Sequence, residues 1–571
     1  MKKKSLLIAA SALLASSVYA ANGDKFEIDG LVYTILSEAD HTVSVKSPDY
    51  TYAVSGHLNI PATVTNDDIV YTITTLPAVA FQYCNHITSV DIPATVTNIA
   101  TNSFYRCTAL TDINVDENNP AYTSSDGVLY NNDMTELISC PNAKSGGFNI
   151  PQSVTTISTN GFNGCTELTS ITIPDGVTAI GGNAFYLCTS IKSIHIPAAV
   201  THTATSPNFF GRCSSLEEIT VDPENKEYCS VDGVLYSKDM TTLVQYPVAR
   251  QGDVILPESV TSLSDFSFSD CEALTTVNIP ARIANIGGGA YSYCPNITEF
   301  IVDENNPSYC SVDGVLYNKA QTTLTLYPNA RTGSFTVPGN IATLSTNAFR
   351  GAGISSIVIP ATVSAMSGQT FQDCSNLSKM VDLKPQPQSI SYATIHGTPS
   401  SMIVYVPAGC KEAYEKAWPA ILNIEEINDF VVVISAVEMQ MTIGETADLK
   451  ADIVSTGDVA VKTRTWSSSN PSVATVDESG KVTAIADGSA TITVAVTDEN
   501  DQTRSDMCEI TISPKADIIE IVADPVEAIN YSTPLDVYDL SGKKVSNSVS
   551  NLSPGIYVVH QGSKTAKIAI E

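Results

Sequence analysis

Apolar side chains in this sequence recur in a short alternating pattern that ends in an Ile-Pro pair. The segment CTELTSITIP at residues 165–174 returns as CTSIKSIHIP at residues 188–197, which is 23 positions later. Near the end of the first copy, Ile171 and Ile173 flank the polar Thr172. Neighbouring side chains of a strand point to opposite faces. We therefore predict one short strand per repeat, with its apolar side chains buried and its polar side chains exposed.

The Ile-Pro pair, in which Leu or Val sometimes replaces Ile, marks nine repeats. In four places adjacent markers lie 22 or 23 residues apart, and in three places the gap widens to 58 or 60 residues. The markers are Ile60, Ile92, Ile150, Ile173, Ile196, Leu256, Ile279, Val337 and Ile359. A period of about 20–29 residues with one strand per unit is typical of leucine-rich repeats. Such units must stack, because none of them can bury its apolar side alone.

The three wide gaps contain a second, related element. Each ends in Asp-Gly-Val-Leu-Tyr, a polar break and another apolar run, as in SVDGVLYSKDMTTLVQYPVA at residues 230–249. The Asp-Gly pair favours a tight turn between antiparallel strands. We predict a solenoid that is interrupted three times by the same β-hairpin.

Eight of the thirteen cysteines occupy one position of the repeat. They are Cys84, Cys107, Cys165, Cys188, Cys213, Cys271, Cys294 and Cys374. One repeat has Ala352 near this place, which indicates that a small apolar residue is needed for packing. We favour buried free thiols in the structural core, with disulfides between neighbouring turns as the alternative. Metal binding is disfavoured because no Cys-x-x-Cys or close Cys/His cluster occurs.

The side chains predicted to point outward from the repeat strands form a candidate ligand face. They are Ser89, Asp91, Asp112, Asn114, Ser170, Thr172, Ser193, His195, Glu218, Thr220, Thr276, Asn278, Glu299, Ile301, Ser356 and Val358. We expect one continuous sheet face, mostly of short polar side chains, with Ile301 and Val358 exposed near its end. Such side chains offer hydrogen bonds at a low cost in ordering. The three hairpins are the alternative site, because loops often carry function.

Composition and charge narrow the classes of function. The chain has 571 residues, with 60 acidic against 30 basic side chains and a formal net charge of −30. Such a surface repels phosphate backbones and anionic lipids, so we expect no nucleic-acid partner. No apolar run after the N-terminal one reaches the length of a membrane span. We expect a monomer.

The N-terminus carries a targeting signal. Three lysines precede an apolar run and a small-residue cleavage site at Ala20 in MKKKSLLIAASALLASSVYA. These features predict a secretory signal peptide at residues 1–20. The mature protein is therefore expected to be secreted, in association with the cell surface.

The sequence shows no motif for catalysis or for a cofactor. His-Glu-x-x-His, Gly-x-Ser-x-Gly and the phosphate-binding loop are missing. The acidic segments VDENNP at residues 115–120 and 302–307 are predicted to be turns, with calcium binding as the less favoured interpretation. We predict no enzyme, no cofactor and no metal, while paired carboxylates of a glycosidase stay open.

The repeat pattern, C-x-x-L-T-x-I-x-I-P-x-x-V-T-x-I-x-x-x-A-F, resembles the BspA-like (Treponema-type) leucine-rich repeat. TWSSSNPSVATVDESGKVTAIADGSATITV at residues 465–494 resembles the bacterial Ig-like domain of group 2, with Trp466 in the core of its sandwich. The ending, with VYDLSGKKV and LSPGIYVV, resembles the C-terminal sorting domain of the Bacteroidetes type IX secretion route.

These resemblances imply a mainly β protein. We expect a signal peptide at 1–20, an N-terminal β cap at 21–59, a solenoid with its C-terminal cap at 60–428, an Ig-like sandwich at 429–514, and a small β sorting module at 515–571. The implied function is an adhesin-type surface protein that binds an extracellular protein or glycan. A glycan-binding or carbohydrate-active component of a nutrient-uptake system is the alternative.

Overall fold

The computed structural model describes most of the chain after the N-terminal segment. The described residues are 22–48, 54–203, 209–250, 254–514, 518–521, 535–538, 544–546, 555–561 and 564–570. The predicted signal peptide at 1–20 lies outside them. The helices of the described part are α1 (Tyr392–Ile395) and α2 (Lys411–Ala417), both near the end of the solenoid.

The repeat strands form one column of the solenoid. They are β4 (Ser55–Asn59), β7 (His86–Ile92), β9 (Asp112–Val115), β13 (Gly146–Asn149), β15 (Leu168–Thr172), β17 (Ser193–Ile196), β19 (Glu218–Val221), β24 (Thr276–Ile279), β26 (Glu299–Val302), β30 (Gly333–Thr336), β32 (Ile354–Ile359), β34 (Lys379–Asp382), β35 (Ile403–Pro407) and β36 (Asn423–Ile427). Paired members run parallel, as with Ile194 opposite Ile219 in β17 and β19. Burial alternates as predicted along strands such as β17 and β24, because every second side chain faces the core, whereas all residues of β32 are buried.

A second column consists of two-residue strands formed by the Val-Thr-x-Ile stretches. Its members are β8 (Asn98–Ile99), β14 (Thr156–Ile157), β16 (Ala179–Ile180), β18 (His202–Thr203), β23 (Ser262–Leu263), β25 (Asn285–Ile286), β31 (Thr343–Leu344) and β33 (Ala365–Met366). Each turn of the chain thus places one repeat strand and one short strand on two sides of a common core.

Each insertion contains the predicted hairpin and a third strand. The strands are β10 (Tyr122–Ser125), β11 (Val128–Asn131) and β12 (Glu136–Ser139), then β20 (Tyr228–Val231), β21 (Val234–Ser237) and β22 (Thr242–Gln245), and finally β27 (Tyr309–Val312), β28 (Val315–Asn318) and β29 (Thr323–Leu326). The first two strands of each set pair antiparallel, and the third pairs parallel with the next short strand. The apolar run after each hairpin therefore continues the short-strand column.

The N-terminal cap closes the first turn. It comprises β1 (Lys25–Ile28), β2 (Leu31–Ser37), β3 (Thr42–Lys46), β5 (Thr63–Asn66) and β6 (Ile69–Leu76). These strands follow the order β1-β2-β3-β6-β5, and β8 pairs with β6. The sheet covers the apolar end of the stack, which a repeat array needs in order to stay soluble.

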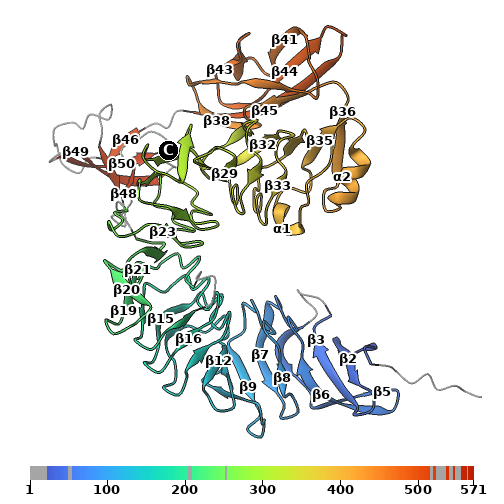
Figure 1. Cartoon of the computed structure of the whole chain (residues 1–571), viewed down its shortest axis with the longest axis vertical. Helices are drawn as coiled ribbons and strands as arrows, with labels where there is room; N and C mark the ends of the chain where they lie inside the picture. The colour runs from blue at the N-terminus through green and yellow to red at the C-terminus, as the bar shows by residue number, and fades with distance from the viewer. Residues whose placement is uncertain are drawn as a thin grey trace, which may run out of the picture.

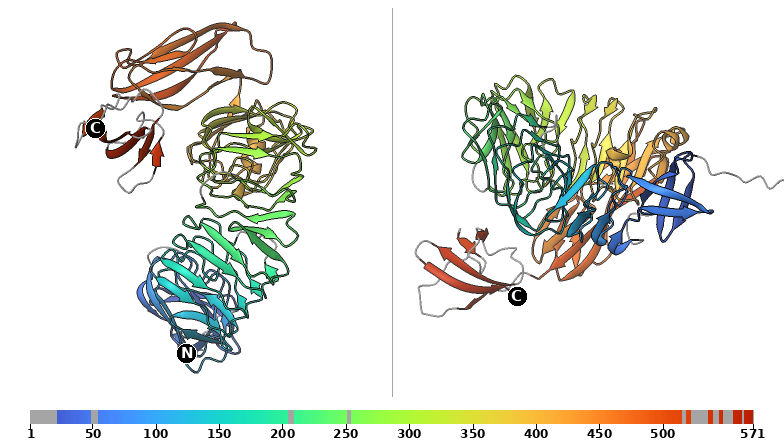
Figure 2. Two further views of the ribbon diagram at one scale, coloured as in Figure 1. Left: turned by 90° about the vertical axis from the view of Figure 1, so that its left-hand side faces the viewer. Right: turned by 90° about the horizontal axis from the view of Figure 1, so that it is seen from below.

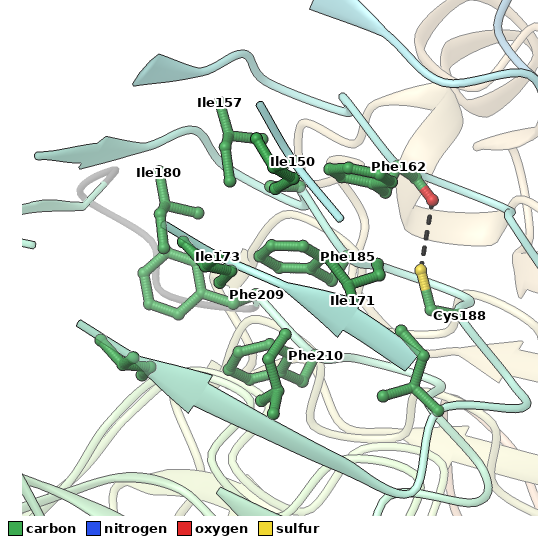
Figure 3. Packing of buried hydrophobic residues seen from close by; sticks show 14 of the residues in the cluster. Ile150, Ile157, Phe162, Ile171, Ile173, Ile180, Phe185, Cys188, Phe209 and Phe210 are labelled. Carbon is green, nitrogen blue, oxygen red and sulfur yellow. Dashed lines mark hydrogen bonds between the residues drawn. The ribbon is translucent and has the colours of Figure 1, made fainter. Parts of the chain in front are cut away.

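Stacked phenylalanines fill the core. The ring centroids of Phe162 and Phe185 lie 5.4 Å apart, and those of Phe185 and Phe210 lie 5.5 Å apart, with the planes nearly parallel in both pairs. Figure 3 shows these three rings one above another between the isoleucines of the strands. Equivalent rings therefore repeat at the spacing of the turns, which explains the recurring Ala-Phe stretch.

The solenoid bends into an open arc, with α1 on its inner side (Figure 1). On that side, turns that flank an insertion touch directly, although 58 or 57 residues separate them. Asn160 donates to Asn102 at 2.8 Å, and Arg350 donates to the hydroxyl of Tyr293 at 2.8 Å. Away from the inner side, the three strands of the insertion lie between the same two turns. Each insertion is thus a wedge that lengthens one side of the stack and bends it.

The Ig-like sandwich follows the solenoid and lies on the outer side of the arc (Figure 1). One part pairs β37 (Val431–Ile434) with β40 (Ala451–Val454), and the larger sheet has the order β38-β45-β44-β41. The bounds are β38 (Glu438–Thr442), β39 (Thr446–Asp448), β41 (Val461–Ser468), β42 (Ala474–Val476), β43 (Lys481–Ala484), β44 (Gly488–Asp498) and β45 (Thr503–Ser513). Trp466 packs against the core of this sandwich.

The C-terminal strands form a separate small sheet. They are β46 (Ile518–Ile521), β47 (Asp536–Tyr538), β48 (Lys544–Ser546), β49 (Gly555–Gln561) and β50 (Lys564–Ile570), in the order β46-β50-β49-β47-β48. Figure 2 shows this sheet standing clear of the solenoid. Parts of VYDLSGKKV and LSPGIYVV lie outside the described residues.

Candidate interaction surfaces

The structure places the eight repeat cysteines in the core as free thiols. Each of them is at most 1% exposed. In five turns the thiol donates to the main-chain carbonyl of the phenylalanine in the preceding turn, at S–O distances of 2.9 to 3.2 Å. Figure 3 shows one of these bonds, between Cys188 and Phe162. The cysteine is thus a small apolar residue that also satisfies a buried carbonyl.

Burial also affects the chemistry of these thiols. Desolvation raises the pKa of Cys107, Cys213 and Cys374 to about 12 in each case. The thiolate is the reactive form of cysteine, so these side chains are inert at neutral pH while the protein stays folded. Their oxidation state in solution stays a prediction.

The outward-pointing residues of the repeat strands define the strand face. Fourteen of the sixteen predicted residues are exposed or half-exposed: Ser89, Asp91, Asp112, Asn114, Ser170, Thr172, Ser193, His195, Glu218, Thr220, Thr276, Asn278, Glu299 and Ile301. Ile301 is 45% exposed. The first part of the face, from β4 to β26, is therefore open and mostly polar.

The expectation of one continuous sheet was wrong. The repeat strands form separate sheets, β4-β7-β9, β13-β15, β17-β19, β24-β26 and β30-β32-β34-β35-β36. After β9, β19 and β26, the Asp-Gly turn of an insertion takes the place of the next strand. Gly127, for example, accepts a hydrogen bond from the amide of Ile113 at 2.8 Å. The hairpins and the strand face are consequently neighbours.

Hydrogen bonds connect neighbouring strands of the open face. The ring of His57 bonds Ser89 through Nδ1 at 2.8 Å and contacts the carboxylate of Asp91 through Nε2 at 3.1 Å. Asn114 donates to the same carboxylate at 3.0 Å. Further along, His195 Nδ1 lies 3.0 Å from Thr220 Oγ1. These polar side chains are ordered by one another before any partner binds.

The last two predicted residues, Ser356 and Val358, are buried, which corrects the expectation that Val358 is exposed. Val358 is only 4% exposed, because the Ig-like sandwich packs on this end of the face. The contact is an apolar cluster that joins the repeat strands to β37 and β40. Its members are Val358, Val381, Ile427, Val431, Val433 and Val454.

Polar contacts fix the sandwich in register with the solenoid. Lys379 Nζ lies 2.5 Å from Asp506 Oδ2, and the two side chains are only 14% and 13% exposed. The same Asp506 oxygen accepts the amide of Ile434 at 2.9 Å. The amide of Ser334 donates to the carbonyl of Ser435 at 2.8 Å. Since these contacts are largely buried and join both parts of the chain, the sandwich and the end of the solenoid form one unit.

A row of polar residues on the inner side was missed by the sequence reasoning. We name Arg212, Asp270, Tyr293, Arg350 and Asp373 the inner spine. Arg212 pairs with Asp270 at 3.4 Å and lies over the ring of Tyr293 at 4.5 Å, while the hydroxyl of Tyr293 donates to Asp373. All except Arg350 directly precede a repeat cysteine. This recurring polar position is the feature of the sequence from which the inner spine could have been predicted.

The acidic segments act as turns. In the first, the buried Asn119 donates to the carbonyls of Pro93 and Val96 at 2.9 Å, and it accepts the amides of Ala121 and Tyr122. Its equivalents Asn225 and Asn306 do the same in the other two insertions. Within the described residues no group of three or more His, Cys, Asp or Glu is arranged to hold a metal ion.

No helix within the described part of the chain is both long and apolar enough to cross a bilayer.

A stack of parallel turns, each contributing one repeat strand, defines a leucine-rich-repeat solenoid with an appended Ig-like sandwich. The profile of the BspA type leucine rich repeat region matches in six copies, over residues 62–145, 139–243, 250–315 and 325–427. The chain therefore belongs to the BspA-type leucine-rich repeat family. The profile of the bacterial Ig-like domain (group 2) matches residues 432–506.

Individual proteins match more weakly. An uncharacterised protein of Clostridium acetobutylicum is 41% identical over 80 residues, which are 14% of this chain and 20% of that protein. The chain thus spans about a fifth of the length of this curated relative.

Two solved structures cover more of the chain. A leucine rich cell surface protein of Faecalibacterium prausnitzii is 24% identical, covers 71% of this chain and 95% of its own, and has a TM-score of 0.34. The pneumococcal vaccine antigen PcpA is 18% identical, covers 72% and 100%, and also has a TM-score of 0.34.

Proposed function

We propose that this protein is a secreted or cell-surface interaction protein whose strand face, from β4 to β26, binds an extracellular macromolecule. One observation carries the proposal: this part of the face is open and polar, whereas the Ig-like sandwich covers the rest. Extended curved surfaces of this kind are what solenoids offer to partners. The sandwich, docked on the outer side, leaves the open part accessible.

The charge of the face favours a protein partner with basic side chains. Asp91, Asp112, Glu218 and Glu299 all belong to the open part, and the whole chain carries a formal charge of −30. Complementary charges accelerate encounter and reject like-charged partners. We expect binding to weaken as salt is added, because exposed charges are screened.

Export and surface display complete the proposal. Residues 1–20 have the features of a secretory signal peptide. The C-terminal segment resembles a type IX sorting domain, and one structural neighbour is described as a cell surface protein. We infer that the chain leaves the cytoplasm and is displayed on the outside of the cell.

The test measures binding of intact residues 21–571 to immobilised extracellular-matrix proteins by surface plasmon resonance, beside a glycan array. Thr172→Arg and Thr220→Arg place positive charge on the strand face. Val231→Arg and Val312→Arg place the same charge on hairpin positions that are 40% and 42% exposed. We expect the face variants to weaken binding about tenfold at an unchanged melting temperature, while the hairpin variants bind normally.

Two results would contradict this proposal. If the hairpin variants abolish binding and the face variants do not, the site belongs to the hairpins. If no matrix protein binds and glycans do, the partner class is wrong.

A further inference from the structure

A sizeable cavity lies on the inner side of the arc, at the first insertion. Its volume is about 760 Å³, and its walls come from residues 99–106, from the insertion, and from residues 156–163. Pockets of roughly 300–1,000 Å³ are the usual size for small-molecule ligands. The cavity lies where the sheet that ends in β8 is followed by the sheet that contains β12 and β14.

The gap between these sheets is built into the fold. The amide of Ile99, at the open edge of β8, donates to the hydroxyl of Tyr122 at 2.8 Å. The third insertion repeats this arrangement, with the amide of Ile286 donating to Tyr309 at 2.9 Å. A tyrosine therefore satisfies the strand edge in place of another strand.

A chain of amides runs along one wall of the cavity. Asn163 Nδ2 donates to Asn160 Oδ1 at 2.9 Å, and Asn160 Nδ2 donates to Asn102 Oδ1 at 2.8 Å. Asn163 is only 4% exposed, yet its Oδ1 has no hydrogen-bond partner within the described chain. A buried acceptor without a partner costs about 1–3 kcal/mol. This unpaired acceptor belongs to a residue of the cavity wall.

Arg106 lines the same cavity without a carboxylate partner. Its buried Nε has no hydrogen-bond partner, and it forms no ion pair with a described residue. At the second insertion the equivalent Arg212 pairs with Asp270, which directly precedes the next repeat cysteine. At the first insertion that position is Gly164. The first arginine thus lacks the acid that the second one has.

The remaining groups suit a polyhydroxylated ring. Glu136 accepts the hydroxyl of Ser158 at 2.5 Å, and Thr156 and Thr159 line the same cavity. Tyr105 adds an aromatic ring beside Arg106. Amides, hydroxyls and a carboxylate can donate to and accept from ligand hydroxyls, and the guanidinium matches a carboxylate in two parallel bonds.

We propose that this cavity binds a saccharide unit that carries a carboxylate, with the carboxylate on Arg106 and a ring hydroxyl donating to Asn163 Oδ1. Uronic acids and sialic acids share this chemistry. A phosphate is disfavoured because a single cation faces the cavity. An apolar ligand is disfavoured because it would leave Asn163 and Arg106 unpaired. This site is separate from the strand face, and it can fail without affecting that proposal.

The experiment is isothermal titration of intact residues 21–571 with three probes. They are a galacturonate trisaccharide, sialyllactose and, as the neutral reference, lactose. We expect one of the two acidic probes to bind at least about tenfold more tightly than lactose, and which one binds identifies the source. Arg106→Gln should remove this preference, and Arg106→Lys should retain part of it.

Arg212→Gln is the matched control, because it removes the equivalent guanidinium outside the cavity. It should leave saccharide binding unchanged, and circular dichroism verifies that each variant is folded. The proposal is overturned if neither acidic probe binds at millimolar concentration. It is equally overturned if Arg106→Gln binds the acidic probe as well as the wild type does, or if lactose binds equally.

Discussion

The ion pair between Lys379 and Asp506 should decide how firmly the Ig-like sandwich docks on the solenoid. Both side chains are almost completely buried, at 14% and 13% exposure. Lys379→Met removes the cation and leaves a buried carboxylate. Breaking a buried pair in this way costs about 3–5 kcal/mol. Because Asp506 keeps the amide of Ile434 as a donor, we expect about 3 kcal/mol.

The double variant Lys379→Met, Asp506→Asn removes both charges and keeps similar volumes. An amide oxygen can still accept the amide of Ile434, so no buried charge is left. We expect docking within about 1 kcal/mol of the wild type, which corresponds to a coupling energy of about 2 kcal/mol or more. The control is Lys462→Met, which breaks an exposed pair with Asp501 in the same sandwich. That change should cost no more than about 1 kcal/mol.

Native-state hydrogen exchange measures the docking free energy directly. The amide of Ser334, which donates to Ser435 across the contact, is protected only while the sandwich is docked. Peptides covering residues 330–336 and 431–435 should exchange faster in Lys379→Met and recover in the double variant. If Lys379→Met changes protection no more than Lys462→Met does, the pair does not hold the interface. If the double variant is as labile as Lys379→Met, the buried charge is not the cause.

Three further predictions test the core, the inner spine and the buried end of repeat strand β34. In the folded protein iodoacetamide should leave the eight repeat cysteines unmodified, and after unfolding without reductant it should label all of them. Repeat cysteines that stay unlabelled in the unfolded, unreduced protein would indicate disulfides. Tyr293→Phe removes the hydroxyl shared by Arg350 and Asp373 and should cost about 1–3 kcal/mol in urea unfolding, whereas Tyr83→Phe, at an exposed ring, should cost almost nothing. Burial raises the pKa of the Asp382 carboxyl to about 6, so the native state loses stability as pH rises from about 4 to 6, where only the unfolded chain ionises freely. Asp382→Asn should therefore raise the urea midpoint at pH 7 and leave it unchanged at pH 3, and an equal gain at both values would contradict this reasoning.

The alternating pattern predicted the repeat strands because it reports which side chains face the core. Ile171 and Val277 are buried, while Thr172 and Asn278, which directly follow them in the sequence, are exposed. The pattern cannot report what covers the other face. Val358 and Ile301 are both apolar and both point outward, yet only Val358 is buried. The difference is that Val358 belongs to a cluster with apolar residues of the sandwich, and Ile301 does not.

The inner spine and the cavity could not be predicted for a different reason. The contacts that close the inner side join residues 57 to 81 positions apart, such as Arg350 with Tyr293 and Arg212 with Tyr293. Nothing in the local sequence pairs these positions. They meet because each insertion adds its strands to one side of the stack only. This geometry depends on the third strand of the insertion, which joins the short-strand column and not the inner side.

One element therefore sets three properties of this solenoid. The inserted strands bend the stack, because the inner turns close on each other directly while the other side gains length. The Asp-Gly turn of each insertion caps a repeat strand and divides the strand face. On the inner side, the residue before the repeat cysteine then decides whether an arginine finds an acid. Asp270 pairs with Arg212, whereas Gly164 has no side chain to offer Arg106. The first insertion therefore keeps an arginine without a carboxylate partner beside its polar cavity.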